Sequence, residues 1–351
     1  MKARKGFRLI LVLLILASFI MSGCGSEATT DSSDEKVLNV FNWAEYLPKK
    51  VIKDFEQETG IKVNYGTYSS NEEMFAKLNT GQGQYDLAVA SLYYVDVLIK
   101  EGLVEEIDQG KIPNVKNIGE EFLGKDADPE DKYSVPYLWG EELIVMNTDL
   151  VDKKVTSIKD LLDPQFKNSL VILDDPRTVI GSALAVLGYS PNSTNEKEIE
   201  EAGKWLKKLK PNIKVFDSDN AKALLASGEV KGGIVYGAEA SLAIRENKAI
   251  EKIYPKEFLS LWQDNFVIPK GAKHKENALK FIDYILRPEV SKEIVMDYPY
   301  ANPNTEAVKL LPEDIRKEID IPEEEAKRGT HMKDVGEATV IYDRIWAELK
   351  Q

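Results

Sequence analysis

The sequence predicts an α/β protein that folds into two lobes, and three observations support this prediction. Short apolar segments alternate with amphipathic segments, a pattern typical of a sheet covered by helices. About 315 residues follow a polar segment that ends at Lys36, and this length is large for a single hydrophobic core. No internal repeat is visible, so a repeat architecture is not expected.

The first half of the chain predicts three strands and three helices in alternation. The segment 48–59 predicts a helix, because Pro48 favours a helix start and Gly60 can adopt the left-handed conformation that ends one. Ser70 and Glu73 form a capping-box pattern, which predicts a helix through residue 79. The remaining predicted elements are strands at 37–41, 61–65 and 87–90 and a helix at 94–100.

The same alternation resumes after residue 140. Strands are predicted at 143–146, 170–173 and 234–236, and helices at 196–209 and 277–286, the latter closed by Pro288. A last helix is predicted over 334–349, where apolar residues from Val335 to Leu349 recur at helical spacing. The pattern leaves open where the chain crosses between the lobes, and segments 139–142 and 262–266 are the candidates.

The first 36 residues predict an export signal and a tether outside the fold. A basic start precedes an apolar run over 9–20, which is shorter than the roughly 20 residues of a membrane span and fits a signal peptide. The sequence Met-Ser-Gly-Cys at 21–24 resembles the lipobox of bacterial lipoproteins, although Met21 stands where Leu is usual. This resemblance implies a signal peptide at 1–23, lipidation of Cys24 and a flexible tether at 24–36. The alternative is a signal anchor followed by an incidental cysteine.

Charge and cysteine content limit the possible classes of protein. Cys24 is the only cysteine, so no intramolecular disulfide can form. The net charge is −13, and it becomes −17 without residues 1–23, which carry four basic residues and no acidic one. An acidic balance disfavours nucleic-acid binding and is compatible with a cationic ligand.

Common catalytic signatures are missing from the chain. The sequence has no G-x-S-x-G, P-loop, H-E-x-x-H or C-x-x-C motif, which favours a binding protein over an enzyme and implies no cofactor. The two histidines are too few for a typical histidine-rich metal site, so no metal site is expected. His274 lies among lysines and is predicted to be a solvated surface residue.

Four segments combine aromatic and acidic residues in loops that follow strands. Aromatic faces pack on methylene chains and attract cations, whereas each buried ammonium group needs carboxylates or other acceptors. Together these segments suit a small organic cation with several amines. They are FNWAEY (41–46), SLYYVD (91–96), LWQDN (261–265) and YPYANPN (298–304).

These segments and their surroundings resemble the spermidine/putrescine-binding proteins of bacterial polyamine ABC transporters. The resemblance extends almost continuously from Val37 to Leu349. It includes FNWAEYLP, YDLAVASLYYVD, YSVPYLWG, LDDPR and DVGEATVIYD. The combination of NW-x-EY, S-x-YYVD and W-x-D is specific, although each motif alone is weak.

The resemblance implies a two-lobed, hinged periplasmic-binding-protein fold of type II, with the ligand cleft between the lobes. It implies an N-terminal lobe at 37–141 plus 263–309 and a C-terminal lobe at 142–262 plus 310–351. The implied function is extracytoplasmic capture of polyamines, spermidine and/or putrescine, for delivery to the permease of an ABC importer. The protein is expected to be a monomer, anchored to the cell membrane through Cys24 and without a nucleic-acid partner.

The resemblance also implies the ligand contacts. Trp43 and Trp262 correspond to aromatic walls, and Glu45, Asp175 and Asp264 to carboxylates for ligand amines. The remaining implied contacts are Tyr46, Ser91, Tyr93 and Tyr300, with Tyr298 a competitor for the position of Tyr300.

Four positions depart from the family pattern. Ala44 replaces a hydroxyl residue, and Tyr236 replaces a Trp while keeping an aromatic ring. Thr178 stands where the spermidine-preferring type has a Glu, and Met332 where it has a Gln. Glu239 could supply a replacement carboxylate, so the number and spacing of recognised amines stay open.

Several alternative interpretations remain at this stage. Trp43 and Trp262 can be core aromatics, and Asp175 can be only a helix cap before Pro176. Adjacent tyrosines at 93–94 also occur in ferric-ion-binding members of this superfamily. The solute can instead be a sugar or an amino-acid-like compound, for which Arg177 is the only arginine near a candidate site. An enzyme is the third possibility.

Overall fold

The computed structural model describes residues 36–351 and shows a mixed α/β fold, as the sequence predicted. Within these residues eleven strands join one sheet with the central order β2-β1-β3-β10-β5-β8-β6-β7. The strands are β1 (Val37–Trp43), β2 (Lys62–Tyr68), β3 (Leu87–Ser91), β4 (Val104–Glu105), β5 (Ser134–Asn147), β6 (Leu170–Ile172), β7 (Ile213–Phe216), β8 (Gly232–Tyr236), β9 (Ile250–Ile253), β10 (Ser260–Pro269) and β11 (Thr330–His331).

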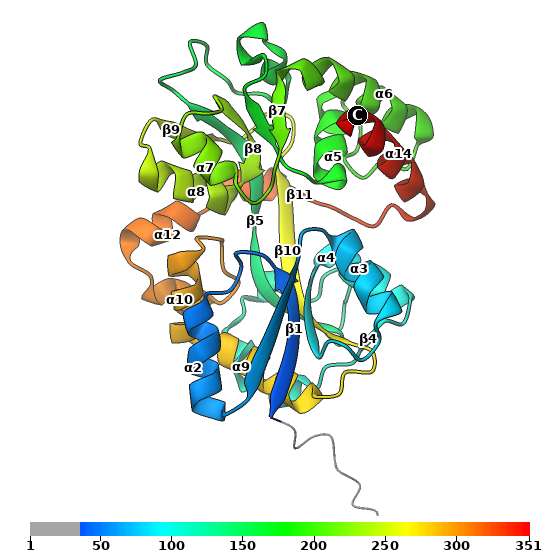
Figure 1. Cartoon of the computed structure of the whole chain (residues 1–351), viewed down its shortest axis with the longest axis vertical. Helices are drawn as coiled ribbons and strands as arrows, with labels where there is room; N and C mark the ends of the chain where they lie inside the picture. Colours follow the sequence, from blue (N-terminus) through cyan, green and yellow to red (C-terminus); the bar gives the residue numbers. More distant parts are fainter. Residues whose placement is uncertain (1–35) are drawn as a thin grey trace, which may run out of the picture. The chain divides into compact units, whose positions relative to one another are not determined.

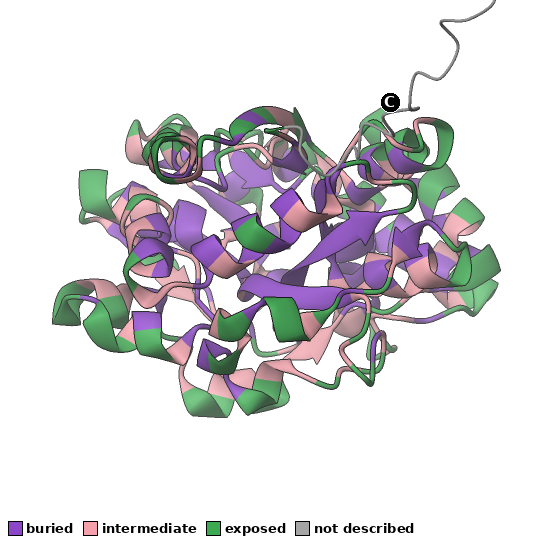
Figure 2. Cartoon of the chain, turned by 90° about the horizontal axis from the view of Figure 1, so that it is seen from below, coloured by how far each residue is buried: buried purple, intermediate pink, exposed green. Residues whose placement is uncertain are grey.

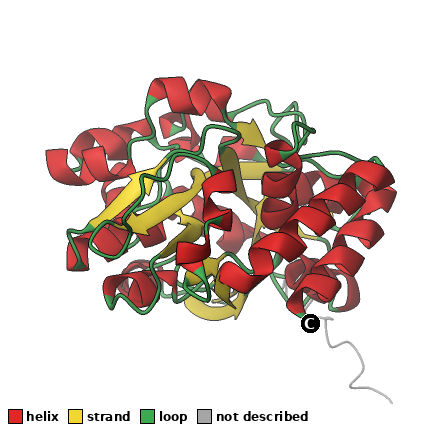
Figure 3. Cartoon of the chain, turned by 90° about the horizontal axis from the view of Figure 1, so that it is seen from above, coloured by secondary structure: helices red, strands yellow, loops and turns green. Residues whose placement is uncertain are grey.

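Helices cover the sheet, and Figure 3 shows them packed around the strands. They are α2 (Lys49–Thr59), α3 (Asn71–Thr80), α4 (Leu92–Lys100), α5 (Pro176–Val186), α6 (Glu196–Leu209), α7 (Ala221–Ala226), α8 (Gly237–Glu246), α9 (Lys275–Ile285), α10 (Pro288–Asp297), α11 (Thr305–Leu310), α12 (Glu313–Ile319), α13 (Glu323–Arg328) and α14 (Thr339–Lys350).

Two long strands connect the two lobes. β5 and β10 pair in antiparallel fashion from Ser134 opposite Val267 to Glu142 opposite Ser260, and they run through the centre of the fold (Figure 1). The first part of β5 contributes Leu138 to a core that it shares with β1, α2 and α9. Its last part contributes Ile144 to a second core, shared with α5, α6 and α14. The strands are buried at the centre while exposed residues lie on the outer helices (Figure 2).

Local sequence signals explain most element ends. Gly60 ends α2 with a φ of 69°, and its N–H donates to the Glu56 carbonyl at 2.9 Å. The Ser70 side chain caps α3 by accepting from the N–H of Glu73 at 3.1 Å. The Glu73 carboxylate accepts from the N–H of Ser69 at 3.1 Å, so the capping box is shifted by one residue on that side.

The predicted C-terminal helix over 334–349 is wrong at its start. α14 begins at Thr339, after a 3₁₀ turn at 336–338. Gly336 has a φ of 54°, a left-handed conformation that interrupts an α-helix, although the flanking apolar residues keep helical spacing. Pro288 also does more than end a helix, because it is the first residue of α10.

The prediction of a solvated His274 is wrong. His274 is buried, and its Nδ1 lies 3.0 Å from Oδ2 of the buried Asp86. The other oxygen of Asp86 accepts from the N–H groups of Lys273 and His274 at 3.0 and 2.9 Å. The lysines around His274 misled the sequence reading, because the carboxylate that draws the ring inward lies far away in the chain.

The lobe boundaries that follow from the resemblance stay a prediction. The two crossing strands and the separate cores are compatible with boundaries near 141 and 262. Residues 1–35, with the predicted signal peptide and Cys24, lie outside the described residues. Among residues 36–351, no helix combines the length and apolar character needed to cross a membrane.

Candidate functional site

A pocket lies where β5 and β10 pass from one lobe to the other. It has about 940 Å³ of atom-free space, a volume that includes the part open to solvent. All of the side chains predicted to bind ligand line it. These are Trp43, Glu45, Tyr46, Ser91, Tyr93, Asp175, Thr178, Tyr236, Glu239, Trp262, Asp264 and Tyr300.

Asp264 is the buried carboxylate at the N-terminal side of the pocket. Its position on β10 places it opposite Ser91 at the end of β3, because these two strands pair in antiparallel fashion. Oδ1 accepts from the Ser91 hydroxyl at 2.7 Å, and Oδ2 accepts from the Tyr46 hydroxyl at 2.8 Å. Burial raises the pKa of Asp264 to about 6, although these two hydrogen bonds oppose the rise.

Asn71 at the start of α3 holds the neighbouring polar groups in place. Its side-chain Nδ2 donates to the Ser91 hydroxyl at 3.1 Å and to the Tyr93 hydroxyl at 3.2 Å. The Tyr137 hydroxyl donates to the backbone carbonyl of Tyr46 at 2.7 Å. These contacts fix the orientation of the groups around Asp264.

Aromatic rings form a continuous wall of the pocket. The ring centroid of Trp262 lies 5.3 Å from that of Tyr300 and 6.0 Å from that of Tyr236, both with near-perpendicular rings. Tyr46 completes this group at 5.0 Å from Tyr300. Trp43 and Trp262 are half-buried, line the pocket and also pack on the N-terminal core, so core packing is compatible with the predicted contact to a ligand. Tyr300, and not Tyr298, is among the pocket-lining residues.

Asp175 caps α5 and also faces the pocket. Its Oδ1 accepts from the N–H of Thr178 at 2.9 Å, and Pro176 is the first residue of the helix. Burial and the negative charge of Glu72 raise the pKa of Asp175 to about 6. The cap and a role in the pocket are therefore compatible.

Glu142 is a pocket residue that the sequence reading missed. It lies on β5 beside Thr178, whose hydroxyl donates to Oε1 at 2.7 Å. The other oxygen, Oε2, is buried, and the hydroxyl of Ser260, opposite Glu142 on β10, also interacts with this carboxylate and opposes the rise of its pKa. Burial and the nearby Asp175 raise the pKa of Glu142 to about 8. The available signal was two adjacent glutamates inside an otherwise apolar strand.

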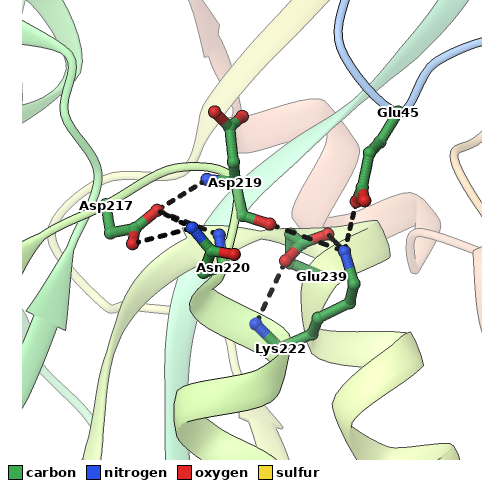
Figure 4. Close-up of polar contacts among 6 residues, drawn as sticks. All are labelled: Glu45, Asp217, Asp219, Asn220, Lys222 and Glu239. Atoms are coloured by element: carbon green, nitrogen blue, oxygen red, sulfur yellow. Dashed lines mark hydrogen bonds and ion pairs between the residues drawn. The ribbon is translucent and has the colours of Figure 1, made fainter.

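Glu45 and Glu239 form a further group of acids in the pocket, together with Asp219, which the sequence reading also missed. Glu45 follows β1 and Glu239 lies in the first turn of α8. Both carboxylates contact the ammonium group of Lys222 (Figure 4). Within residues 36–351 no cluster of three or more His, Cys, Asp and Glu side chains is arranged to hold a metal ion.

Arg177 lines the pocket, but its guanidinium is engaged elsewhere. Nη2 donates to Asn192 at 3.0 Å and to the Lys333 carbonyl at 2.9 Å. The guanidinium carbon lies 4.5 Å from the ring centroid of Tyr342. These contacts account for Nη2 and for one face of the guanidinium, while the buried Nε and Nη1 have no hydrogen-bond partner within residues 36–351.

The fold and the pocket define a two-lobed solute-binding protein, and the comparisons with known proteins agree. Residues 50–323 match the model of the family described as bacterial extracellular solute-binding protein, and the chain belongs to this family. It is 44% identical over 323 residues to the spermidine/putrescine-binding periplasmic protein of Salmonella typhimurium, covering 91% of this chain and 93% of that protein.

Solved structures give the same result. A spermidine/putrescine ABC transporter protein from Listeria monocytogenes superposes with a TM-score of 0.87 at 35% identity, covering 90% of this chain and 99% of that chain. A lipoprotein of Treponema pallidum superposes with a TM-score of 0.79 at 32% identity, covering 89% and 99%. The predicted two-lobed binding-protein fold is confirmed by these similarities.

Proposed function

We propose that this protein captures a polyamine outside the cytoplasm and delivers it to the permease of an ABC importer. The observation that supports this most strongly is a set of carboxylates in the aromatic pocket, of which Asp264 and Glu142 are buried and Asp175 is half-buried. Burial raises the pKa values of Asp264, Asp175 and Glu142 to about 6, 6 and 8, so a cation bound beside them would stabilise their charged forms.

A diamine or longer polyamine supplies what these groups lack. Its ammonium groups pair with carboxylates, and its methylene chain packs on the rings of Trp43, Trp262 and Tyr300. The names of the relatives agree with this ligand class. The other residues proposed to contact the ligand are Glu45, Tyr46, Ser91, Tyr93, Thr178, Tyr236 and Glu239.

A sugar or an amino-acid-like solute fits the pocket less well. An amino acid requires a cation for its carboxylate, and the guanidinium of Arg177 is engaged by Asn192, the Lys333 carbonyl and Tyr342. A neutral sugar leaves the buried carboxylates unpaired. We propose that the protein binds its ligand without catalysing a reaction on it.

The export and anchoring steps belong to the same proposal. The lipobox-like sequence before Cys24 supports a mature lipoprotein held at the outer face of the cell membrane, and we propose that it acts as a monomer. The tether at residues 24–36 then gives the binding lobes freedom to reach the permease.

Calorimetric titration tests the ligand. Putrescine and spermidine are titrated into the wild-type protein and into Asp264→Asn, whose uncharged amide leaves an ammonium group poorly paired. We expect binding of at least one polyamine to the wild type and at least tenfold weaker binding to the variant, the equivalent of about 1.4 kcal/mol.

Glutamate and glucose serve as control solutes in the same titration. Binding of one of these and of neither polyamine would reject the proposed function. Equal polyamine affinity in wild type and variant would remove Asp264 from the site.

A further inference from the structure

Lys222 places an ammonium group of the protein itself beside the pocket, against carboxylates that line it. It is the second residue of α7, and its Nζ contacts a carboxylate oxygen of Glu45 and lies 3.3 Å from Oε1 of Glu239 (Figure 4). Nζ also lies 3.5 Å from the backbone carbonyl of Asp219. The three partners of this ammonium group are all pocket-lining residues.

The local fold holds this ammonium group in position. Asp217 stabilises the turn before α7 by accepting from the N–H groups of Asp219 and Asn220, both at 2.9 Å (Figure 4). The backbone N–H of Lys222 donates to Oε2 of Glu239 at 3.0 Å, so one glutamate binds both ends of the residue. Glu239 itself is buried.

Lys222 is charged in this setting. Burial alone would lower its pKa, but the hydrogen bond to Glu45 and the charge of Glu239 raise the pKa instead. Its side chain is 24% exposed, and that of Glu239 is 6% exposed, so this pair is partly shielded from solvent. The ammonium group thus partly neutralises carboxylates that a ligand amine would otherwise use.

We propose that Lys222 determines the length of the ligand by acting as a tethered ammonium group at the Glu45–Glu239 end of the pocket. The inference rests on the proposed polyamine function and specifies its ligand. A diamine such as putrescine has its charges paired by the remaining carboxylates, Asp264, Asp175 and Glu142. A triamine such as spermidine brings a further ammonium group to an end that already holds one.

Electrostatics explain the expected discrimination. Two ammonium groups at the same carboxylate pair repel each other, and this repulsion is strong where solvent is partly excluded. Asp219 is the other acid beside Lys222, and partial burial together with the charges of Asp217 and Glu45 raises its pKa. Asp219 is exposed, however, and water and salt screen its attraction for an additional amine.

The test compares putrescine and spermidine affinities by titration calorimetry in wild type, Lys222→Met and Lys222→Gln. Both substitutions remove the ammonium group and free Glu45 and Glu239 for a ligand amine. We expect the ratio of spermidine to putrescine affinity to rise at least tenfold in both variants. Lys222→Arg keeps the charge, and its ratio should stay within twofold of the wild-type ratio.

Lys207→Met is the matched control for net charge. Lys207 pairs with Glu348 at 2.9 Å on the outer surface of α6 and α14, and its loss should leave the ratio unchanged. An unchanged ratio in both Lys222 variants would overturn the inference, and so would an equal change in the two affinities. Failure of the wild type to bind either polyamine would instead reject the proposed function, and the inference with it.

Discussion

Replacing Glu142 by Gln is expected to stabilise the empty protein and weaken ligand binding at the same time. Glu142 is buried, accepts a hydrogen bond from the Thr178 hydroxyl and also interacts with the Ser260 hydroxyl. A glutamine has nearly the same shape and can accept the same hydrogen bond. The substitution therefore removes mainly the charge.

The magnitude follows from the pKa of about 8, against 4.5 for an ordinary glutamate. A raised pKa in the folded state contributes stability that is fully present below pH 4.5 and is lost as the pH rises through 8. At pH 7 the unfolded chain is ionised and the folded state is mostly protonated, which destabilises the fold by on the order of 3 kcal/mol. A glutamine cannot ionise, so the Glu142→Gln variant avoids this loss of stability. Its thermal midpoint should be higher than that of the wild type by at least about 3 °C.

Thermal unfolding at pH 8 and pH 5, with calorimetric titration of putrescine at pH 8, provides the assay. The stability difference should shrink to under about 1 kcal/mol at pH 5, where the unfolded glutamate is close to its own pKa. Putrescine affinity should fall at least tenfold at pH 8, because the variant cannot supply a negative charge. A variant with unchanged affinity and no pH-dependent gain in stability would refute the reasoning.

Glu141→Gln is the matched control because the two glutamates are adjacent on β5 and point to opposite faces of the sheet. Glu141 is buried outside the ligand pocket and lies 3.8 Å from Nζ of Lys252, whose side chain is 18% exposed. Burial raises the pKa of Glu141 and the charge of Lys252 opposes this rise, so the substitution removes a buried carboxylate of the same strand without removing one from the pocket. Putrescine affinity should stay close to the wild-type value.

Two further predictions concern pH and the anchor. Polyamine affinity should fall on the order of tenfold between pH 7.5 and pH 5 for each carboxylate with a pKa of about 6, namely Asp264 and Asp175, because the protonated acid cannot pair with an ammonium group. Binding near pH 6 should therefore release protons, which titration in two buffers of different ionisation enthalpy measures; pH-independent affinity without proton release would contradict this prediction. Cys24→Ser should release the protein from the membrane fraction or leave its signal peptide uncleaved, and a processed variant that still sediments with membranes would show that the anchor lies elsewhere.

Local patterns in the sequence were sufficient to predict many of the helices and strands. The helix over 196–209 has the predicted bounds, because its apolar face and charged face alternate without interruption. The strand predicted at 143–146 is part of the much longer β5, whose buried glutamates and glycine hide the strand pattern. The register of β5 and β10, which brings the lobes together, depends on contacts between distant residues.

The pocket was predictable where the chemistry is carried by short motifs. Trp43, Tyr46, Ser91 and Asp264 come from such motifs, and the structure places them in one pocket. Glu142 was not predictable in this way, because its importance depends on the hydroxyl of Thr178 on another element. The resemblance implies a Glu at position 178 in the spermidine-preferring type, where this chain has Thr178. Only the structure shows that Thr178 donates a hydrogen bond to a carboxylate on β5.

The distribution of these carboxylates also explains how a ligand would control the lobes. Asp264 lies with Ser91 and Tyr46 at the N-terminal side, whereas Asp175 and Glu142 contact Thr178 on the C-terminal side. A cation that pairs with only one side gives no preference for closure. A diamine that reaches both sides stabilises the closed arrangement by its differential affinity for it. Ionised carboxylates are unfavourable in a closed pocket that holds no ligand cation. Without ligand, the same charges therefore favour separation of the two lobes. The Lys222 ammonium group opposes that opening at one end only, through its contacts with Glu45 and Glu239.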